Sequence, residues 1–337
     1  LALIEGEGGV IPDAADLVRR HGYGDCKGLS AYLISLCRAL GIEAHPVLVR
    51  TSHLGPLATS VPNMAQFNHF LVWADDGEAG CWLDPTVHGY PAGVLPLADA
   101  CWPVLLIQPD CAGLSEIPRA AWEPGRFVVT VRGILDPDGV LHLRVELAAD
   151  GAQGAGLAAT ALTAPAGVWQ DRLHRLLLPA SLPISVDEVA NPIAAAKGGE
   201  QVGGEPAAWS LTAVSKQPLP GAGGRLFLPK VLPALDPHLI DSRDDSAAVD
   251  LRRIPDRQES WWIELPDGWC LATPETLCVQ GAGLKWRRLV WQEARSLRLE
   301  RRLEWTADGG EVDDAAELRS AQTAALAAER GYFTLQR

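Results

Sequence analysis

The stretch from Gly22 to Leu40 constrains the fold most, because it predicts a helix that begins at a cysteine. After Cys26, apolar residues recur at intervals of three and four, as on a helix with one buried face: Leu29, Leu33, Leu36, Cys37 and Leu40. Gly41 is expected to end this helix. Unpaired backbone N–H groups and the helix dipole favour a thiolate in the first turn. Cys26 is therefore a candidate nucleophile, and a buried, inert cysteine is the alternative.

Two segments further on are predicted to pair as antiparallel strands. The segments FNHFLVWADD and CWLDPTVHGY flank the polar turn DDGEAG, and IEAHPVLVRT predicts another strand before them. His69 lies on the first arm and Asp84 on the second, so the two can be cross-strand neighbours. A cysteine nucleophile needs a base, and the base needs a third group that fixes its tautomer. The sequence predicts a catalytic set of Cys26, His69 and Asp84.

Residues next to this set are candidates for the walls of a cleft. Five of them are expected to line it: Asp25, Phe67, Asn68, Trp82 and His88. Asp25 is also a candidate helix cap or loop hydrogen-bonder, and Lys27 is expected to face solvent. The remaining nearby histidines are predicted to be structural or exposed, because none has a carboxylate arm placed opposite it: His21, His45 and His53.

Composition narrows the class of protein. A chain of 337 residues can form two domains with separate cores. The net charge of −13 argues against a nucleic-acid partner, and no Lys/Arg block reverses it locally. No apolar run has the length of a membrane span. The chain begins with Leu1 rather than Met, so we expect an N-terminally truncated chain whose targeting segment is not visible, which leaves both periplasm and cytoplasm open.

The seven cysteines include no CxxC pair and no zinc-ligand spacing, so neither a metal nor a cofactor is expected. Because seven is odd, at least one thiol is unpaired within the chain. Cys101 with Cys111, or Cys270 with Cys278, could form disulfides in an oxidising compartment. Reduced and mostly buried cysteines are the preferred prediction.

The chain becomes rich in strands after residue 118. Two strands joined by DPDG, a helix near residues 168–178, a flexible loop at 195–206 and a last helix at 313–330 are predicted. The Ala/Gly-rich stretch ending at Gly156 is interpreted as leading into the first of these helices. Short strands separated by turns are typical of a β-sandwich. Tryptophans in these strands are predicted to fill its core rather than to bind a ligand: Trp261, Trp262, Trp269, Trp286, Trp291 and Trp305.

Three sequence segments resemble the transglutaminase-like superfamily. GDCKGLSAYLISLCRALGIEAHPVLV resembles its nucleophile helix and following strand, FNHFLVW its histidine strand, and CWLDPT its aspartate strand. EGEGGVIPDAADLVRRHGYGDCKG is similar to bacterial proteins in which this core follows an N-terminal β-sandwich domain of unknown function (DUF3857). The resemblance implies an α+β fold: a papain-like transglutaminase core at residues 1–118 and a mostly β, sandwich-like C-terminal domain with a terminal helix at 119–337. The family's N-terminal sandwich is not in this chain and is an expected contact partner, and the backbone N–H of Cys26 is the visible oxyanion donor.

The resemblance and the predicted catalytic set together imply a cysteine-dependent acyltransferase, peptidase or amidase. Cys26 would form a thioester with a protein or peptide substrate, with water or an amine as the open choice of acceptor. The alternative is a non-catalytic scaffold with the transglutaminase fold, which binds partners through its β-rich domain. A metal hydrolase is disfavoured, because the sequence has no HExxH motif.

Overall fold

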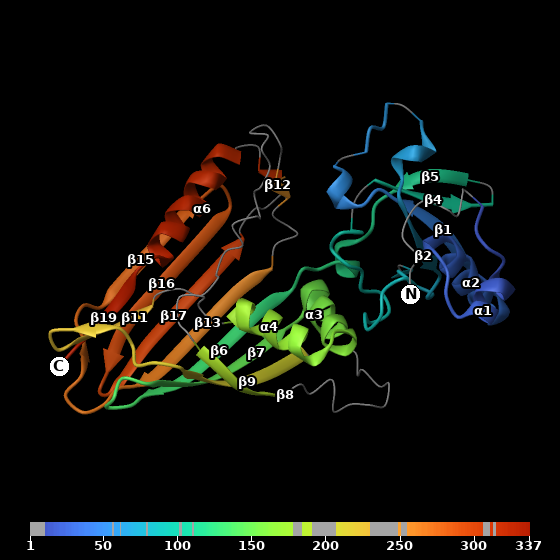
Figure 1. Ribbon diagram of the computed structural model, residues 1–337. Coiled ribbons are helices and arrows are strands. Elements are labelled where there is room, and N and C mark those ends of the chain that lie inside the picture. Colours follow the sequence, from blue (N-terminus) through green and yellow to red (C-terminus); the bar gives the residue numbers. More distant parts are fainter. Residues whose placement is uncertain are drawn as a thin grey trace. The chain divides into compact units, whose positions relative to one another are not determined.

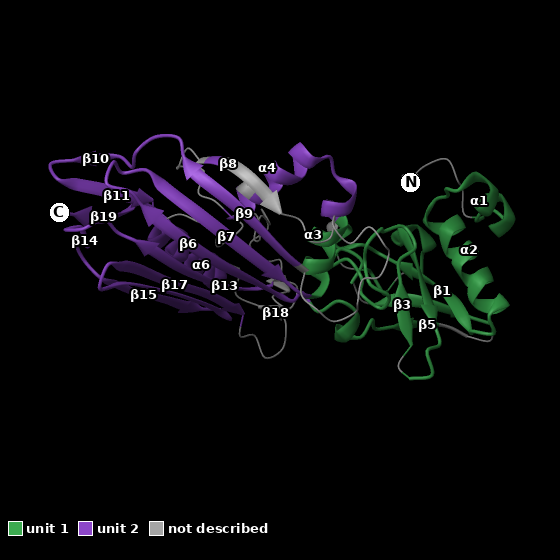
Figure 2. Cartoon of the chain, turned by 90° about the horizontal axis from the view of Figure 1, so that it is seen from below, with its two compact units in different colours: residues 1–123, 151–159 green, residues 124–150, 160–337 purple. Residues whose placement is uncertain are grey.

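The structure is a computed structural model. It describes residues 11–55, 57–60, 62–78, 80–100, 103–109, 111–177, 184–190, 207–229, 249–250, 255–305, 311–312 and 315–337. The chain divides into two compact units, residues 1–123 with 151–159 and residues 124–150 with 160–337 (Figure 2). The α+β fold with a β-rich region is confirmed. The assignment of residues 1–118 to a transglutaminase-like core stays a prediction, and the predicted loop at 195–206 lies outside the described residues.

The first unit contains a five-stranded antiparallel sheet with the order β3-β2-β1-β4-β5 (Figure 1). Its strands are β1 (Ala44–Val49), β2 (His69–Ala74), β3 (Cys81–Leu83), β4 (Val104–Gln108) and β5 (Cys111–Ser115). Before the sheet come the helices α1 (Ala15–His21) and α2 (Cys26–Ala39). Short 3₁₀ turns lie at Ser52–Leu54, Met64–Gln66 and Arg119–Ala121. Strand β1 pairs with β2 along its whole length, which fixes the register of the histidine strand.

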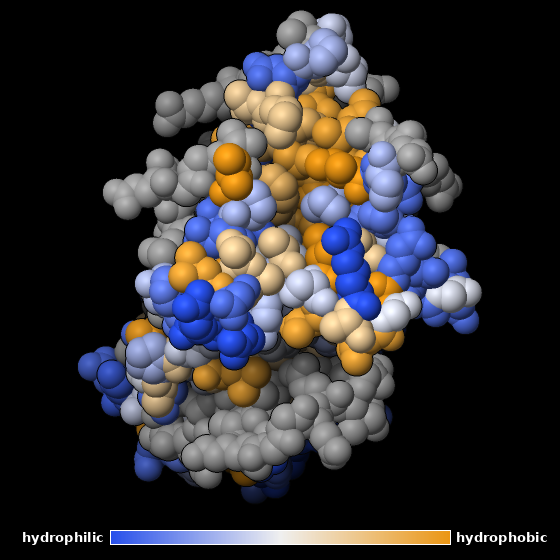
Figure 3. Space-filling model, turned by 90° about the vertical axis from the view of Figure 1, so that its right-hand side faces the viewer, coloured by the Kyte–Doolittle hydropathy of each residue, from blue (hydrophilic) through white to orange (hydrophobic). Residues whose placement is uncertain are grey.

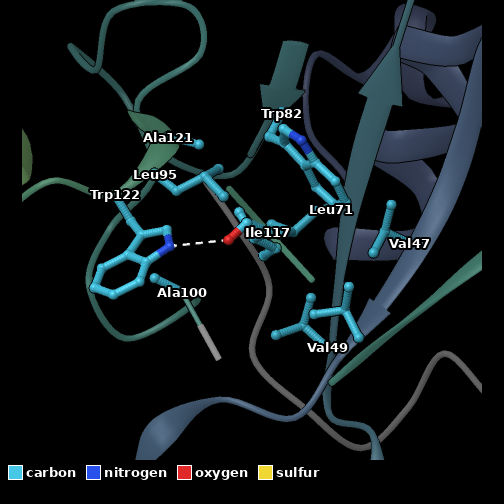
Figure 4. Close-up of a cluster of buried hydrophobic side chains, with 10 residues drawn as sticks. Val47, Val49, Leu71, Trp82, Leu95, Ala100, Ile117, Ala121 and Trp122 are labelled. Atoms are coloured by element: carbon cyan, nitrogen blue, oxygen red, sulfur yellow. Dashed lines mark hydrogen bonds between the residues drawn. The ribbon is translucent and has the colours of Figure 1, made fainter. Parts of the chain in front are cut away.

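Each face of this sheet buries its own cluster of apolar side chains, because successive side chains of a strand point to opposite faces. Helix α2 packs on one face, where Ile34 meets Val72. On the other face Leu71 and Trp82 join a cluster that includes the segment before β4 (Figure 4). The indole of Trp122 closes this cluster by donating to the carbonyl of Ile117 at 3.1 Å. Through Leu95 and Ala100 the cluster anchors the segment that leads from β3 to β4.

The second unit contains an eight-stranded sheet with the order β15-β16-β17-β13-β6-β7-β9-β8. These strands are β6 (Arg126–Leu135), β7 (Leu141–Ala149), β8 (Ile184–Ala190), β9 (Ala207–Ser215), β13 (Asp256–Glu264), β15 (Glu275–Gly281), β16 (Leu284–Glu293) and β17 (Ser296–Trp305). A four-stranded sheet has the order β10-β11-β19-β14: β10 (Gly221–Ala222), β11 (Arg225–Pro229), β19 (Tyr332–Gln336) and β14 (Cys270–Leu271). A third sheet pairs β12 (Val249–Asp250) with β18 (Glu311–Val312).

One face of the eight-stranded sheet is covered and the other is exposed, as the alternating burial along its strands shows. Helix α6 (Ala315–Glu329) packs on the covered face at β15 and β16. Helix α4 (Ala166–Leu177) brings Trp169 against Trp209 of β9, with ring centroids 5.7 Å apart. Phe333 of the four-stranded sheet packs over Arg288 of β16. Among the described residues, the expected packing of one sheet on another is thus seen where the four-stranded sheet meets β16.

Helix α3 (Gly151–Thr163) was not expected, because its Ala/Gly-rich sequence lacks a conventional apolar stripe. Its small residues instead allow a close approach of the helix to its surroundings. An added Cβ at Gly156 would lie 2.8 Å from the hydroxyl of Tyr90. The glycines lower the intrinsic helix propensity of this segment while its alanines raise it, and the close packing adds to the stability of the helix.

The prediction for the tryptophans is partly wrong. Trp261 and Trp286 are buried in the core, but Trp262 is only half-buried. On the exposed face its ring lies between the guanidinium groups of Arg132 and Arg298, at 5.1 and 5.7 Å from their central carbons. Adjacent strand residues point to opposite faces, so the pair Trp261 and Trp262 cannot both reach one core.

The prediction of reduced and mostly buried cysteines is only partly correct: Cys26, Cys37, Cys81, Cys270 and Cys278 are free, but of these Cys37 alone is buried. Cys270 and Cys278 are free and exposed rather than disulfide-bonded, and Cys101 lies outside the described residues. Among the residues that the structure describes, no helix is long and apolar enough to cross a membrane. On the face shown in Figure 3, apolar patches are interspersed with hydrophilic side chains.

Candidate active site

Cys26 is the first residue of helix α2, because the chain before it makes a tight turn and a cap. Helix α1 ends at Gly22 in the left-handed conformation, with φ of 72°. Gly24 then passes close to α1, where an added Cβ would lie 3.3 Å from Val18. Asp25 is the N-cap residue, and its Oδ1 accepts a hydrogen bond of 2.8 Å from the N–H of Gly28. The half-buried Cys26 thus lies where backbone N–H groups are unpaired.

Lys27 does not face solvent, contrary to expectation. Its side chain is 15% exposed, and its ammonium group pairs with the second carboxylate oxygen of Asp25. Burial raises the pKa of Asp25, but hydrogen bonds from Lys27 and Gly28 outweigh this and hold the pKa below its usual range. The carboxylate next to the thiol is therefore neutralised locally by Lys27.

His69 and Asp84 form a hydrogen-bonded pair. His69 is the first residue of β2, and its Nε2 lies 3.0 Å from Oδ2 of Asp84, which follows β3. Val72 pairs with Leu83 in the strand register, so Asp84 comes diagonally across from His69. The other oxygen of Asp84 accepts hydrogen bonds from the N–H and the hydroxyl of Thr86, at 2.8 and 2.7 Å. The carboxylate is 1% exposed and is held in one orientation.

The surroundings of His69 favour its protonated form. Burial lowers the pKa of His69, but hydrogen bonds to Asp84 and Cys26, and the negative charges of Asp84 and Asp99, raise it to about 10. Burial alone would raise the pKa of Asp84, yet its hydrogen bond and charge interaction with His69 bring the pKa below its usual range. Near neutral pH the pair is therefore an imidazolium and a carboxylate. The side chain of Cys26 also contributes to the raised pKa of His69, so the two side chains lie close together.

Asp99 also belongs to this site, although the sequence analysis did not identify it. Its carboxyl group is 7% exposed, and an oxygen of Asp99, an oxygen of Asp84 and a ring nitrogen of His69 lie within 4.8 Å of one another. The available signal was an acidic residue inside the mostly apolar segment LPLADA. These three side chains are close enough to hold a metal ion. Since Nε2 of His69 is hydrogen-bonded to Asp84, a metal ion would have to displace the proton that they share.

The residues expected to line a cleft have different environments. Asn68 directs its side-chain amide at Thr51, accepting from the backbone N–H at 2.9 Å and donating to the hydroxyl at 2.8 Å. Trp82 is 4% exposed and belongs to the hydrophobic core. Phe67 is half-buried at the end of a 3₁₀ turn, and His88 is exposed. Lining of a cleft by these four residues and by Asp25 stays a prediction.

Comparison with known proteins gives a distant structural neighbour. The crystal structure of a "putative protease" from Parabacteroides distasonis aligns with 96% of this chain at 13% identity and a TM-score of 0.46. The chain spans 46% of the length of that protein. No protein-family model matches the sequence. No curated protein matches it either.

Proposed function

We propose that this chain is a transglutaminase-like cysteine enzyme that transfers or hydrolyses acyl groups at amide or peptide bonds. Cys26 is the nucleophile, His69 the proton carrier and Asp84 the carboxylate that orients His69. One observation carries the proposal: Nε2 of His69 is hydrogen-bonded to Asp84, and the same imidazole interacts with the side chain of Cys26, the first residue of a helix. Structural ion pairs also raise histidine pKa values, but they do not require a thiol as the second partner.

The chemistry follows from these positions. The Cys26 thiolate attacks the carbonyl carbon of an amide, so a C–S bond forms and the carbonyl electrons move to the oxygen. The backbone N–H of Cys26 is placed to donate to that oxyanion. As the C–N bond breaks, the imidazolium of His69 gives its proton to the leaving amine, which leaves a thioester. His69 then takes a proton from the acceptor, the acceptor oxygen or nitrogen bonds the acyl carbon, and the C–S bond breaks to regenerate the thiolate.

Asp84 determines which ring nitrogen of His69 exchanges protons with the thiol and the substrate. Because its carboxylate accepts from Nε2 of His69, the other ring nitrogen is the one that exchanges protons with the thiol and the substrate. Thr86 holds the carboxylate from the opposite side, so the imidazole cannot rotate without losing its hydrogen bond. Water as acceptor gives a peptidase or amidase, and an amine gives a transglutaminase. Both activities share the first half of the reaction.

The competing function is a scaffold that binds partners through the β-rich unit. The exposed face of the eight-stranded sheet supports this alternative, because Trp262 lies between Arg132 and Arg298 on it. The two functions differ in what they require of Cys26. A scaffold has no need of a thiol whose reactivity depends on His69.

The test is alkylation by iodoacetamide across pH, followed by peptide mapping. Wild-type protein should be modified first at Cys26, and His69→Ala should lose that preference. His142→Ala is the matched control, because His142 is exposed on β7 of the other unit and lies outside the proposed site. Equal modification of Cys26 in wild type and His69→Ala would favour the scaffold.

A further inference from the structure

Asp99 is a buried carboxyl group next to the proposed His69 and Asp84 pair, and the reaction described above does not use it. It lies in the segment between β3 and β4. We propose that Asp99 is a positioning residue, which donates a hydrogen bond to Asp84 and so holds that carboxylate against His69. This inference rests on the proposed function and adds a fourth side chain to the same site.

The hydrogen-bonding capacity of Asp84 has room for such a donor. An ionised carboxylate offers about four acceptor positions. Thr86 occupies two of them through its N–H and hydroxyl, and His69 occupies a third. The fourth position can accept a hydrogen bond from Asp99, one of whose carboxyl oxygens lies within 4.8 Å of an oxygen of Asp84. Two carboxylates can share such a bond only if one of them carries a proton, so one of this pair is the donor.

The surroundings place that proton on Asp99. Burial raises the pKa of Asp99 most, the positive charge of His69 lowers it, and the negative charge of Asp84 with their shared hydrogen bond raises it, to about 7 in total. Asp84 has the opposite balance, because His69 and Thr86 stabilise its ionised form. The titratable groups that act on Asp99 are His69 on β2 and Asp84 after β3.

Hydrogen bonds and packing fix the backbone around Asp99, and this limits the orientations of its side chain. The N–H of Asp99 donates to the carbonyl of Pro96 at 3.0 Å, and the carbonyl of Ala98 accepts from Ser52 at 2.9 Å. Ala100, the next residue, is 1% exposed within the hydrophobic cluster that also contains Leu95 (Figure 4). This segment is thus joined to the 3₁₀ turn that follows β1 and to the core beneath β2. A buried carboxyl group on such a backbone has little freedom to turn away from Asp84.

Ionisation of Asp99 should loosen the site. Above its pKa, Asp99 loses the proton that it donates and adds a second negative charge beside Asp84. The two carboxylates then repel each other. His69 keeps its proton, but its partner carboxylate is no longer held from the side of Asp99. The site should therefore be best ordered below about pH 7 and less ordered above it.

Carboxyl and imidazole NMR tests this inference without a substrate. In wild-type protein the carboxyl carbon of Asp99 should titrate with a midpoint near 7, while that of Asp84 should not titrate between pH 5 and 9. The Nε2 proton of His69 should give a slowly exchanging signal below that midpoint and lose intensity above it. In Asp99→Asn, whose amide donates without titrating, the signal should persist unchanged through pH 7.

A second variant and a control keep the test decisive. Asp99→Ala removes the donor, so the Nε2 signal of His69 should be weakened at every pH. If Asp99→Ala does not fold, the wild-type titration and Asp99→Asn decide alone. Asp76→Asn, an exposed substitution in the turn between β2 and β3, should leave the wild-type transition in place. A carboxyl group of Asp99 that titrates near 4, or a His69 signal with the same pH dependence in wild type and Asp99→Asn, would overturn the inference.

The role of Asp99 and the proposed function can fail independently of each other. Loss of the Cys26 preference in His69→Ala, together with a His69 signal whose pH dependence is the same in wild type and Asp99→Asn, would reject only the role of Asp99. If alkylation of Cys26 is the same in wild type and His69→Ala but the NMR titration is as expected, the proposed enzymatic function is rejected. Asp99 then remains the group that holds Asp84.

Discussion

Asn68 and Thr51 exchange two hydrogen bonds, and these bonds fix the residue that precedes His69. The amide oxygen of Asn68 accepts from the N–H of Thr51, and its amide nitrogen donates to the Thr51 hydroxyl. The backbone N–H of Asn68 also donates to Val49 at 3.0 Å. Two strand ends are thus tied together immediately before the proposed base. The position of His69 depends on this contact as well as on its own hydrogen bonds.

Asn68→Ala should therefore destabilise the first unit. The substitution leaves a buried N–H at Thr51 without its side-chain acceptor, which costs about 1–3 kcal/mol. Urea unfolding monitors this loss. Asn63→Ala is the matched control, since Asn63 caps an exposed 3₁₀ turn through a hydrogen bond to the N–H of Ala65. If both variants lose the same stability, Asn68 has no special role in holding the strand ends.

Cys26 should be the thiol that reacts first, although it is not the most exposed. Cys270 and Cys278 are exposed, whereas Cys26 is half-buried, so accessibility alone predicts that Cys270 reacts before Cys26. A nearby imidazolium and a helix N-terminus reverse that order. Competitive alkylation with limiting iodoacetamide, quantified by peptide mapping, measures the order. Faster labelling of Cys270 would mean that Cys26 is not activated.

Stability should depend on pH through His69. Its pKa is raised in the folded state from 6.5 to about 10, so its contribution is fully present below about pH 6.5 and is lost as pH rises towards 10. His69→Ala should then be less stable than wild type by on the order of 3 kcal/mol at pH 6, with the difference shrinking at higher pH. Thermal unfolding at pH 6, 8 and 10 measures this. If the difference in stability between wild type and His69→Ala is the same at all three pH values, the folded protein does not hold the proton on His69.

Local sequence patterns predicted the elements around the proposed site well. Helix α2 follows from the spacing of apolar residues after Cys26, and β2 and β3 follow from apolar segments on either side of a polar turn. These patterns are local, so they can be read from neighbouring residues. The placing of His69 near Asp84 followed from the pairing of those two strands, which a short turn enforces.

What could not be predicted depends on long-range packing. Asp99 lies 15 residues after Asp84 with no regular pattern between them, and only the tertiary fold brings its carboxyl group to the site. Helix α3 is stabilised by close packing of small residues, and a glycine-rich sequence does not reveal what it packs against. Lys27 was expected to face solvent because charged residues usually do, and its pairing with Asp25 depends on the exact turn before the helix.

Asp84→Asn should slow the proposed reaction without unfolding the protein. An amide keeps the shape of the carboxylate and can still accept from Thr86, so the protein should fold. It lacks the charge that holds the imidazolium, and turnover should fall by about 10⁴, as for the equivalent change in serine triads. The rate of thioester formation with any acyl donor that labels Cys26 is the measurement. Asp75→Asn, an exposed change in the turn after β2, should behave as wild type. Turnover of Asp84→Asn within tenfold of wild type would remove Asp84 from the proposed set.

The second unit should depend on a buried ion network under its large sheet. Glu259 of β13 is fully buried between Arg257, at 2.5 Å, and Arg301 of β17, and Arg301 also pairs with Glu329 of α6 at 2.8 Å. Burial raises the pKa of Glu259, but the charges of Arg301 and Arg257 hold it below its usual range. The stability that Glu259 contributes is thus present above about pH 4.5 and is lost as pH falls below it.

Glu259→Gln should destabilise the second unit strongly, because it leaves two buried guanidinium groups with one fewer counter-charge. Removing one partner of a buried ion pair costs about 3–5 kcal/mol. The matched control is Glu300→Gln, which alters the neighbour of Arg301 on the exposed face of β17 and should change stability by no more than about 0.5 kcal/mol. Urea unfolding followed by tryptophan fluorescence includes the signal of Trp286, which donates to Glu329 in the same network at 3.0 Å. The difference in free energy of unfolding between the two variants should be smaller at pH 4, where Glu259 begins to be protonated on unfolding. Equal stability of the two variants at pH 7 would show that the network contributes nothing beyond an exposed glutamate.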